Sequence, residues 1–256
     1  MSKYSYQTGY ITHVGKVRSV NQDSLLIRRG SIDGQDFLLL AVADGMGGMS
    51  RGEVASGCAT GLLDQWWSEQ LPQLLSHGLD WQQVENSLTV AVERINSTIR
   101  QSGQENPGQA GTTLTMAFVY QGEYLLFQVG DSRAYLVWDG SLRQLTRDQT
   151  WCAREVEAGR LSREEAAVHP MRHMLISTLG VRPEYILERL RGKIPSGSGL
   201  LLCSDGFYQE LNPEWLGKNP PASVQTLLDQ VLAQELERAA SDNITAILVR
   251  AAKSWR

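Results

Sequence analysis

Residues 112–146 read TTLTMAFVYQGEYLLFQVGDSRAYLVWDGSLRQLT, and this stretch decides the fold. It holds four short runs rich in apolar and β-branched residues, joined by very short links. Gln121-Gly122 and Asp139-Gly140 have the composition of two-residue hairpin turns, in which glycine supplies a positive φ. Parallel strands need crossovers of about a dozen residues or more. The sequence therefore predicts an antiparallel meander and disfavours the doubly wound folds, which alternate strand and helix throughout.

The segments before this stretch predict a buried strand followed by helices. Residues 37–44 read FLLLAVAD, in which six apolar residues after Phe37 lead without a break to the carboxylate of Asp44. A run of this length with an abrupt Asp-Gly end is typical of a buried strand. Two long helices are expected next, one over about residues 51–69 and one whose apolar stripe runs from residue 81 to 99.

The segments after the stretch continue the mixture of strands and helices. Residues 147–185 are polar, charged and weakly helical, and we interpret them as an insertion. A buried strand over 199–205, an amphipathic helix over about 224–232 and a final strand over 243–251 follow. The pattern predicts an α+β protein.

The totals restrict the class of protein. The chain has 256 residues, 42% of them hydrophobic, and a formal net charge of -4, which gives no electrostatic reason to bind nucleic acid or an anionic membrane. Its three cysteines, Cys58, Cys152 and Cys203, lack zinc-site spacing and are expected to be reduced thiols. No apolar run approaches the roughly 20 residues of a membrane span, and the first ten residues do not resemble a signal peptide. We expect a cytoplasmic protein.

Five aspartates stand where apolar strands enter or leave the core. Strands end at Asp44, Asp131 and Asp205, and further strands begin directly after Asp23 and Asp242. If these side chains converge, two carboxylates about 4 Å apart repel by about 4 kcal/mol at an effective dielectric constant near 20. Such a cluster needs a cation. Oxygen-only ligands suit Mg²⁺ or Mn²⁺ better than zinc.

Plainer interpretations remain open for single members of this pattern. Asp131 and Asp242 are also residue types that favour turns. Gly45 and Gly206, each following an aspartate, allow a close approach of the backbone to a metal but are common at strand ends for no functional reason. Arg18, which lies near Asp23 in the sequence, either forms a structural salt bridge or grips a phosphate with two hydrogen bonds.

Eight motifs occur in an order that resembles a known family. They are GKVRSVNQDS, LAVADGMGGMSRGEVAS, GTTLTMAFV, QVGDSRAYLV, LTRDQT, HPMRHMLISTLG, LLCSDGF and DNITAILV. In this order they resemble the motifs of the metal-dependent protein phosphatases of the 2C type, most closely the compact stand-alone bacterial members. The resemblance implies a four-layer α-β-β-α sandwich of two mostly antiparallel sheets flanked by helices. It also implies one phosphatase domain over 1–256, with residues 147–185 as the family's substrate-facing flap.

The resemblance also implies a set of metal ligands for two Mn²⁺ or Mg²⁺ ions and a weaker third: Asp23, Asp44, Gly45, Asp131, Asp205 and Asp242. Asp44 matches the aspartate that bridges the two core ions, and Gly45 matches the residue whose carbonyl holds the second. Asp205 and Asp242 match the other ligands of the first ion.

The remaining roles follow in the same way. Asp23 matches an acid that reaches the second ion through water. Asp131 matches the ligand that holds the third ion together with Asp205. Arg18 matches the phosphate-binding arginine, so the resemblance favours the second of its two interpretations. The catalytic set that it implies is Arg18, Asp44 and Asp205.

The function implied is hydrolysis of phosphoserine and phosphothreonine in proteins. A hydroxide bridging the two ions attacks phosphorus directly, so that no phospho-enzyme forms. The partners implied are a eukaryotic-like Ser/Thr kinase and its phosphorylated targets, and a monomer is expected. The alternative is a catalytically weak or silent family member that acts as a regulatory binding module, whose signature would be the loss of metal-binding aspartates.

Three positions depart from the family pattern. Gln22 replaces a glutamate, which predicts weaker occupancy of the second metal site. Met46 stands where animal relatives carry a histidine proposed as general acid. Gln149 replaces a histidine, which puts any role of that position in doubt. His169 and His173 have the four-residue spacing of a zinc pair, but a proline directly after His169 disfavours the helix that such a pair needs.

Overall fold

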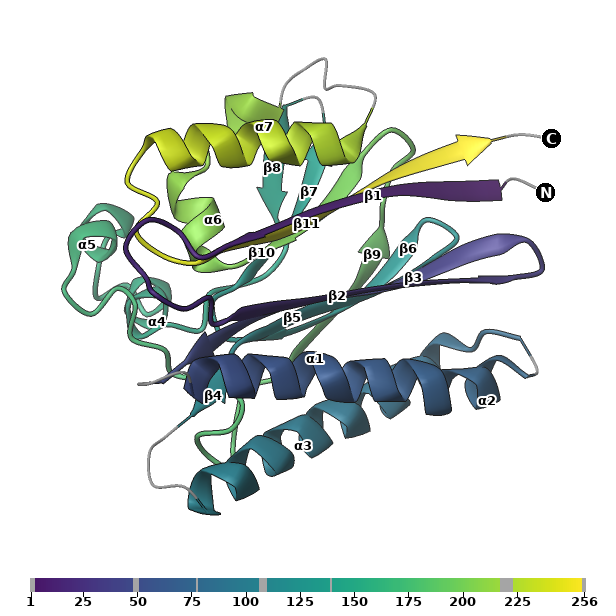
Figure 1. Ribbon diagram of the computed structural model, residues 1–256, viewed down its shortest axis with the longest axis horizontal. Coiled ribbons are helices and arrows are strands. Elements are labelled where there is room, and N and C mark those ends of the chain that lie inside the picture. Colours follow the sequence, from purple (N-terminus) through teal and green to yellow (C-terminus); the bar gives the residue numbers. More distant parts are fainter. Residues whose placement is uncertain are drawn as a thin grey trace.

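The computed structural model describes residues 3–47, 51–76, 78–105, 110–138, 140–216 and 223–254. Along the chain (Figure 1) the elements are β1 (Lys3–His13), β2 (Asp23–Ile32), β3 (Gln35–Met46), α1 (Arg51–Glu69), α2 (Leu71–Leu75), α3 (Trp81–Glu105), β4 (Gly111–Thr112), β5 (Leu114–Tyr120), β6 (Glu123–Val129), β7 (Arg133–Trp138), β8 (Ser141–Gln144), α4 (Trp151–Glu157), α5 (Arg163–Val168), β9 (Glu188–Lys193), β10 (Gly199–Cys203), α6 (Asp205–Glu210), the 3₁₀ turn η1 (Pro213–Leu216), α7 (Val224–Glu237) and β11 (Ile244–Ser254).

Two antiparallel sheets form the centre of the molecule. The first has the strand order β2-β3-β5-β6-β9, with the short β4 paired to β3, and the second has the order β1-β11-β10-β7-β8. Helices α1 and α3 cover the outer face of the first sheet, and α6, α7 and η1 cover the second. The α-β-β-α sandwich predicted above is confirmed.

The apolar run of β3 explains how the two sheets share one chain segment. Alternate residues of a strand point to opposite faces. Leu38, Leu40 and Val42 belong to the core between the sheets, whereas Leu39 and Ala41 pack with the side chains of α1 and α3. Because both faces of β3 are covered, its sequence is continuously apolar instead of alternating.

The predicted meander is correct in its two hairpins and wrong in its middle. β5 pairs with β6 and β7 with β8, both antiparallel, and Gln121-Gly122 has positive φ at both turn residues; Asp139 lies outside the described residues. However, β6 pairs with β9, and β7 pairs with β10 in the other sheet. Gly130, with a φ of 97°, opens the short link between β6 and β7, and the chain crosses there from one sheet to the other.

Strand β9 was not predicted, and its sequence shows why. It reads ERLRGK and alternates half-buried with exposed residues at an edge of the first sheet. Charged residues are common on edge strands, because they oppose further pairing. An edge strand of this composition has no apolar run by which a sequence pattern can find it.

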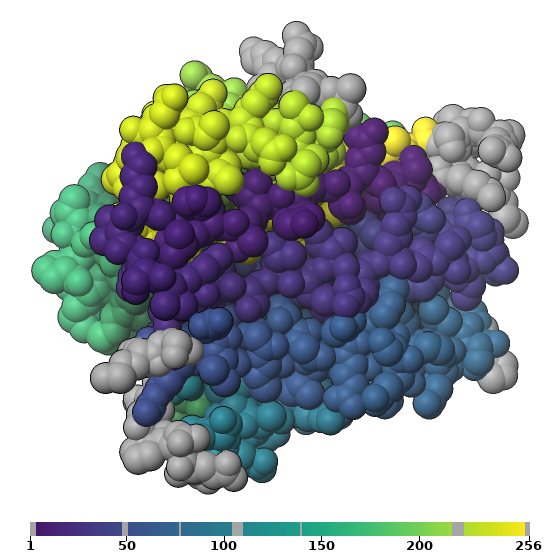
Figure 2. Space-filling model, in the orientation of Figure 1, coloured from purple at the N-terminus to yellow at the C-terminus, as the bar shows by residue number. Residues whose placement is uncertain are grey.

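The segment before β9 contains α4 and α5 and lies at one end of the sandwich. Figure 2 shows it in teal-green at the left edge, beyond the layers formed by α7, the first strands and α1. Thr150 caps the N-terminus of α4, and Ser162 with Glu165 forms a capping box on α5. Both helices are short, so their caps contribute much of their local stability.

Among the described residues, no helix has the length and apolar character that a bilayer crossing requires.

Candidate metal centre

Asp23 and Asp44 lie directly opposite each other in the ladder between β2 and β3. Ser204, which follows β10 in the other sheet, donates a hydrogen bond of 2.8 Å to Asp23 Oδ2. Asp23 Oδ1 is buried and accepts no hydrogen bond from any described residue. Burial raises the pKa of Asp23 to about 7, against the opposing effect of the nearby Thr245 and Ser204.

The backbone of Asp44 is fixed from the opposite side by β4 and the residue that follows it. Its N–H donates to Thr113 Oγ1 at 3.0 Å, and its carbonyl accepts from the Thr113 N–H at 2.9 Å and from the Thr112 hydroxyl at 3.0 Å. The carboxylate therefore has a defined place at the end of a buried strand. Burial raises the pKa of Asp44 well above its usual range, and the charges of the other four aspartates raise it further.

The two Asp-Gly pairs are explained by close packing of the backbone. A Cβ on Gly45 would lie 2.0 Å from the carbonyl oxygen of Gly52 in α1 and 2.6 Å from that of Gln22. A Cβ on Gly206 would lie 2.1 Å from the carbonyl oxygen of Asn243. Glycine is thus required at both positions, because any larger side chain would collide with the backbone that packs beside Asp44 and Asp205.

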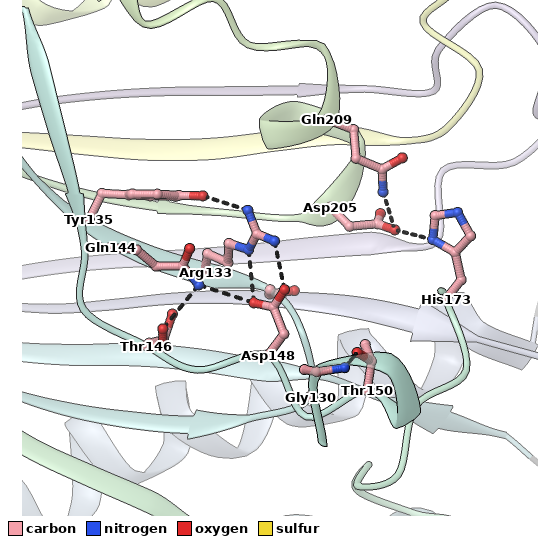
Figure 3. A network of polar contacts seen from close by, with 12 residues as sticks. Gly130, Arg133, Tyr135, Gln144, Thr146, Asp148, Thr150, His173, Asp205 and Gln209 are labelled. Carbon is pink, nitrogen blue, oxygen red and sulfur yellow. Dashed lines mark hydrogen bonds and ion pairs between the residues drawn. The ribbon is translucent and has the colours of Figure 1, made fainter. Parts of the chain in front are cut away.

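The second sheet and the links beside it bring three more carboxylates to the same edge. Asp205 is the first residue of α6, directly after β10; Asp242 precedes β11, and Asp131 lies between β6 and β7. Gln209 donates to Asp205 Oδ2 at 2.9 Å, and His173 Nδ1 lies 3.8 Å from the same oxygen (Figure 3).

The aspartates of this edge act on one another's pKa values. Burial raises the pKa of Asp131 to about 7, and the charges of Asp205 and Asp148 add to the effect. The pKa of Asp205 is raised by burial first and by Asp242 next. Like charges held together in a site of low dielectric constant disfavour ionisation of every member.

Arg18 lies on the loop between β1 and β2 and forms an ion pair with Asp242. The distance from Arg18 Nη2 to Asp242 Oδ2 is 2.8 Å, and the two side chains are 53% and 36% exposed. Of the two interpretations of Arg18 from the sequence, the structure shows the salt bridge. Because both partners are exposed, this bond contributes at most about 1 kcal/mol and is easily exchanged for another.

The residues present fit a hard divalent cation. Mg²⁺ and Mn²⁺ prefer oxygen donors such as these carboxylates, and Asp23 has one oxygen without a partner among the described residues. A bound cation would also offset the mutual repulsion that helps to raise the pKa values of these acids. Among the described residues, no three His, Cys, Asp or Glu side chains yet stand in a ready metal-binding geometry. Asp205 and Asp242 instead point to substitute partners, Gln209 and Arg18.

Asn243, which the sequence did not indicate, fixes the loop between β1 and β2 beside the acidic cluster. Asn243 Oδ1 accepts from the Gln22 N–H at 2.8 Å, and its Nδ2 donates to the carbonyls of Val14 and Val20 at 2.9 and 3.1 Å. It thereby fixes the loop that carries Arg18. The only signal was its place directly after a strand-end aspartate.

His169 and His173 contact different neighbours. His169 is the C-cap residue of α5, and its ring lies 5.1 Å from that of Trp151. His173 instead approaches Asp205.

Comparison with known proteins gives the family. The model of the protein phosphatase 2C family matches residues 13–249, and the chain belongs to this family. The serine/threonine phosphatase Stp of Listeria monocytogenes serotype 4b is 32% identical over 245 residues, which cover 93% of each chain. The predicted family is thus confirmed.

Solved structures agree. The serine/threonine phosphatase of S. agalactiae superposes with a TM-score of 0.86 at 26% identity and covers 96% of this chain and 99% of that one. The catalytic domain of the phosphatase PstP, solved in complex with two manganese ions, gives a TM-score of 0.79 at 29% identity over 98% of this chain and all of that one.

Proposed function

We propose that this chain is a Mn²⁺- or Mg²⁺-dependent phosphatase that removes phosphate from phosphoserine and phosphothreonine in proteins. The observation that carries the proposal is the cluster of five aspartates, of which the most buried members have strongly raised pKa values. When bound, two such ions supply an activated water as nucleophile and positive charge for the phosphoryl oxygens. The names of the Stp and PstP relatives support the same reaction.

The family resemblance gives the residues that would hold the ions, and the position of these side chains at one edge of the sandwich supports it. Asp44, at the centre of the cluster, would bridge the two core ions, with the Gly45 carbonyl on the second. Asp205 and Asp242 would complete the first, and Asp23 would reach the second through water. Asp131 would join Asp205 at a weaker third site.

The protein would contribute two aspartates held rigidly in a buried ladder and an exposed arginine side chain, Arg18. Asp23 and Asp44 are held by the ladder between two buried strands, so little reorganisation is needed when charge develops nearby. Arg18 is half exposed and paired with Asp242, from which it can turn to grip two phosphoryl oxygens. Substrate orientation and charge neutralisation thus fall to Arg18.

The proposed setting of this reaction is the cytoplasm, with a monomeric enzyme acting on proteins phosphorylated by a eukaryotic-like Ser/Thr kinase. The absence of a basic stripe in the sequence and its net charge of -4 argue against a nucleic-acid substrate. The silent binding module is disfavoured, because all five aspartates are present.

The test is hydrolysis of a phosphothreonine peptide with Mn²⁺, with Mg²⁺ or with a chelator, in the wild type and in Asp205→Asn. Loss of a ligand that supports transition-state charge removes several kcal/mol of stabilisation, so we expect a drop in kcat/KM of about 10³-fold. Glu237→Gln, an exposed position on α7, is the control and should keep full activity. Turnover in chelator, or an Asp205→Asn variant as active as the wild type, would refute the proposal.

A further inference from the structure

The turn that carries Asp131 is held by buried amide side chains. Gln128 Nε2 donates to the carbonyls of Gly130 and Ser132 at 3.0 and 2.6 Å. The Ser132 hydroxyl shares a hydrogen bond of 2.7 Å with Thr113 Oγ1, the same atom that accepts from the Asp44 N–H. The turn is therefore tied to Asp44 on one side.

Gln149 ties the other side of this turn to the flap. Its Oε1 accepts from the Gly130 N–H at 2.9 Å, and its own N–H donates to the Gly130 carbonyl at 3.0 Å. Its Nε2 donates to the Gln128 carbonyl at 3.4 Å, and its side chain is buried. The Gln149 carbonyl accepts in turn from the Ile176 N–H at 2.9 Å.

These bonds close the base of the flap. Besides the bond between Gln149 and Ile176, the Trp151 N–H donates to the Met174 carbonyl at 2.8 Å. Residues 149–151 and 174–176, which we call the flap base, thus pair across the segment that contains α4 and α5. A shift of the turn at Gly130 is passed directly to this pairing.

Arg133 and Asp148 flank the same turn. The Arg133 guanidinium binds both oxygens of Asp148, at 2.8 and 2.6 Å, and donates to the Tyr135 hydroxyl at 3.0 Å (Figure 3). The guanidinium also lies 3.6 Å from the centre of the Tyr208 ring in α6, the helix that begins with Asp205. With His173 beside Asp205, the flap therefore contacts the surroundings of both carboxylates of the proposed third metal site.

We propose that Gln149 is a positioning residue that couples the flap base to Asp131, so that a cation bound by Asp131 and Asp205 orders the flap. This inference rests on the proposed function. Gln149 touches neither the ion nor the substrate; it acts through the Gly130 amide. When Gln149 Oε1 is removed, the buried Gly130 N–H loses its hydrogen-bond acceptor. A buried donor without an acceptor lowers the stability of the folded turn.

The experiment measures amide hydrogen exchange and Mn²⁺ binding, without any phosphopeptide. In the wild type, saturating Mn²⁺ should slow exchange in the flap base. In Gln149→Met, which keeps the size of the side chain but not its acceptor, Gly130 should exchange faster without metal, and Mn²⁺ should no longer protect the flap base. In calorimetry the weakest Mn²⁺ step should weaken about fivefold to tenfold, the size of one lost buried hydrogen bond.

Gln144→Met is the matched control. Gln144 Nε2 donates to the Thr146 carbonyl and to Asp148 Oδ1, so the same substitution removes two hydrogen bonds of this network but none to Gly130. It should leave the weakest Mn²⁺ step within about twofold of the wild type. An equal loss in both variants would overturn the coupling.

Two further outcomes separate this inference from the proposed function. If wild-type protein binds Mn²⁺ and hydrolyses the peptide but exchange at the flap base does not change, the coupling is wrong and the function stands. This arm needs no variant and so does not depend on the folding of Gln149→Met. If wild-type protein binds neither Mn²⁺ nor Mg²⁺, both proposals fail.

Discussion

Two of the places where carboxylates are buried are the strand ends around Asp44 and the inner face of α7 at Glu235. In both places oxygen atoms find no hydrogen-bond partner among the described residues: Asp23 Oδ1 in the first, and both Glu235 oxygens in the second. In both the pKa is raised mainly by burial, to about 7 for Asp23 and to about 8 for Glu235.

The neighbours make the difference between the two places. Asp44 is surrounded by four further aspartates, whereas Glu235 lies on the apolar face of α7, among residues such as Leu228 and Val231. Glu235 is affected by one further acid, Glu210, and by the opposing charge of Arg238, whereas a divalent cation can neutralise several of the five acids at one edge together. Burial of a single carboxylate is therefore weak evidence for a metal site, and a cluster of neighbouring buried carboxylates is stronger evidence.

Removing Asp44 should have the largest effect and should separate activity from stability. Asp44→Asn should lower Mn²⁺-dependent hydrolysis by about 10³-fold or more, because the shared ligand of both ions is lost. In chelator the free energy of unfolding of the same variant should exceed that of the wild type by about 1 kcal/mol, since one of several repelling charges is gone. The variant should therefore unfold at a higher temperature. Thermal melting with and without Mn²⁺ measures the second effect.

Asp36→Asn provides the comparison, because Asp36 is a half-exposed aspartate that bonds Arg29 far from the cluster. It should leave hydrolysis unchanged and gain no stability in chelator. A lower melting temperature for Asp44→Asn in chelator would contradict the view that the carboxylates repel one another in the metal-free protein.

Glu235 should affect stability alone, with a dependence on pH. Its pKa is raised from 4.5 to about 8 in the folded protein, so between these values the folded state keeps a proton that the unfolded state has released. Stability contributed by the neutral form is complete below pH 4.5 and is lost as the pH rises to about 8. At about 1.36 kcal/mol for each pH unit, the loss between pH 4.5 and pH 8 is roughly 5 kcal/mol.

Glu235→Gln should therefore be more stable than the wild type at pH 8.5, similar at pH 4.5, and equally active with Mn²⁺. Urea unfolding at several pH values gives the free energies, with Glu237→Gln, an exposed position on the same helix, as the control. A wild type and variant whose stability curves run parallel across this range would show that Glu235 is ionised in the folded protein.

The smallest effect is expected at Gln22, beside the acid cluster. Gln22 Nε2 donates to the Gly47 carbonyl at 3.1 Å, a bond that a glutamate cannot make. Gln22→Glu should thus lower stability in chelator by about 1 kcal/mol. It should also lower the Mn²⁺ concentration needed for half-maximal activity, since a negative charge is added. Gln22→Ala separates the two effects, because it loses the hydrogen bond without adding the charge. If Gln22→Glu needs the same Mn²⁺ concentration as the wild type for half-maximal activity, the added charge does not affect Mn²⁺ binding.

The sequence predicted the elements of the fold better than their pairing. The apolar run of β3 and the stripe of α3 depend on burial alone, and burial leaves a periodic pattern. The crossing at Gly130 depends on which strand accepts β7 as a neighbour, and β9 becomes a strand because β6 offers it an edge. Neither pairing can be predicted from the residues of β7 or β9 alone.

The site was predictable to the same degree. Strand-end aspartates could be found because an acid after an apolar run is unusual. Asn243, Thr113 and Gln149 could not, because they act on backbone groups that are distant in the chain, and a polar residue in a loop gives no sign of its partner. The salt bridge from Arg18 to Asp242 likewise joins residues near opposite ends of the sequence.

The pairing of the first strand with the last has a consequence for biosynthesis. β1 and β11 run antiparallel along their whole length, from Lys3 opposite Ser254 to His13 opposite Ile244, and they leave the sandwich side by side (Figure 1). During translation β1 stays without this partner strand until β11 has been made, and contacts between distant segments form slowly. Asp242 stands just before β11, so a nascent chain acquires the last of the five clustered aspartates only shortly before β1 can pair.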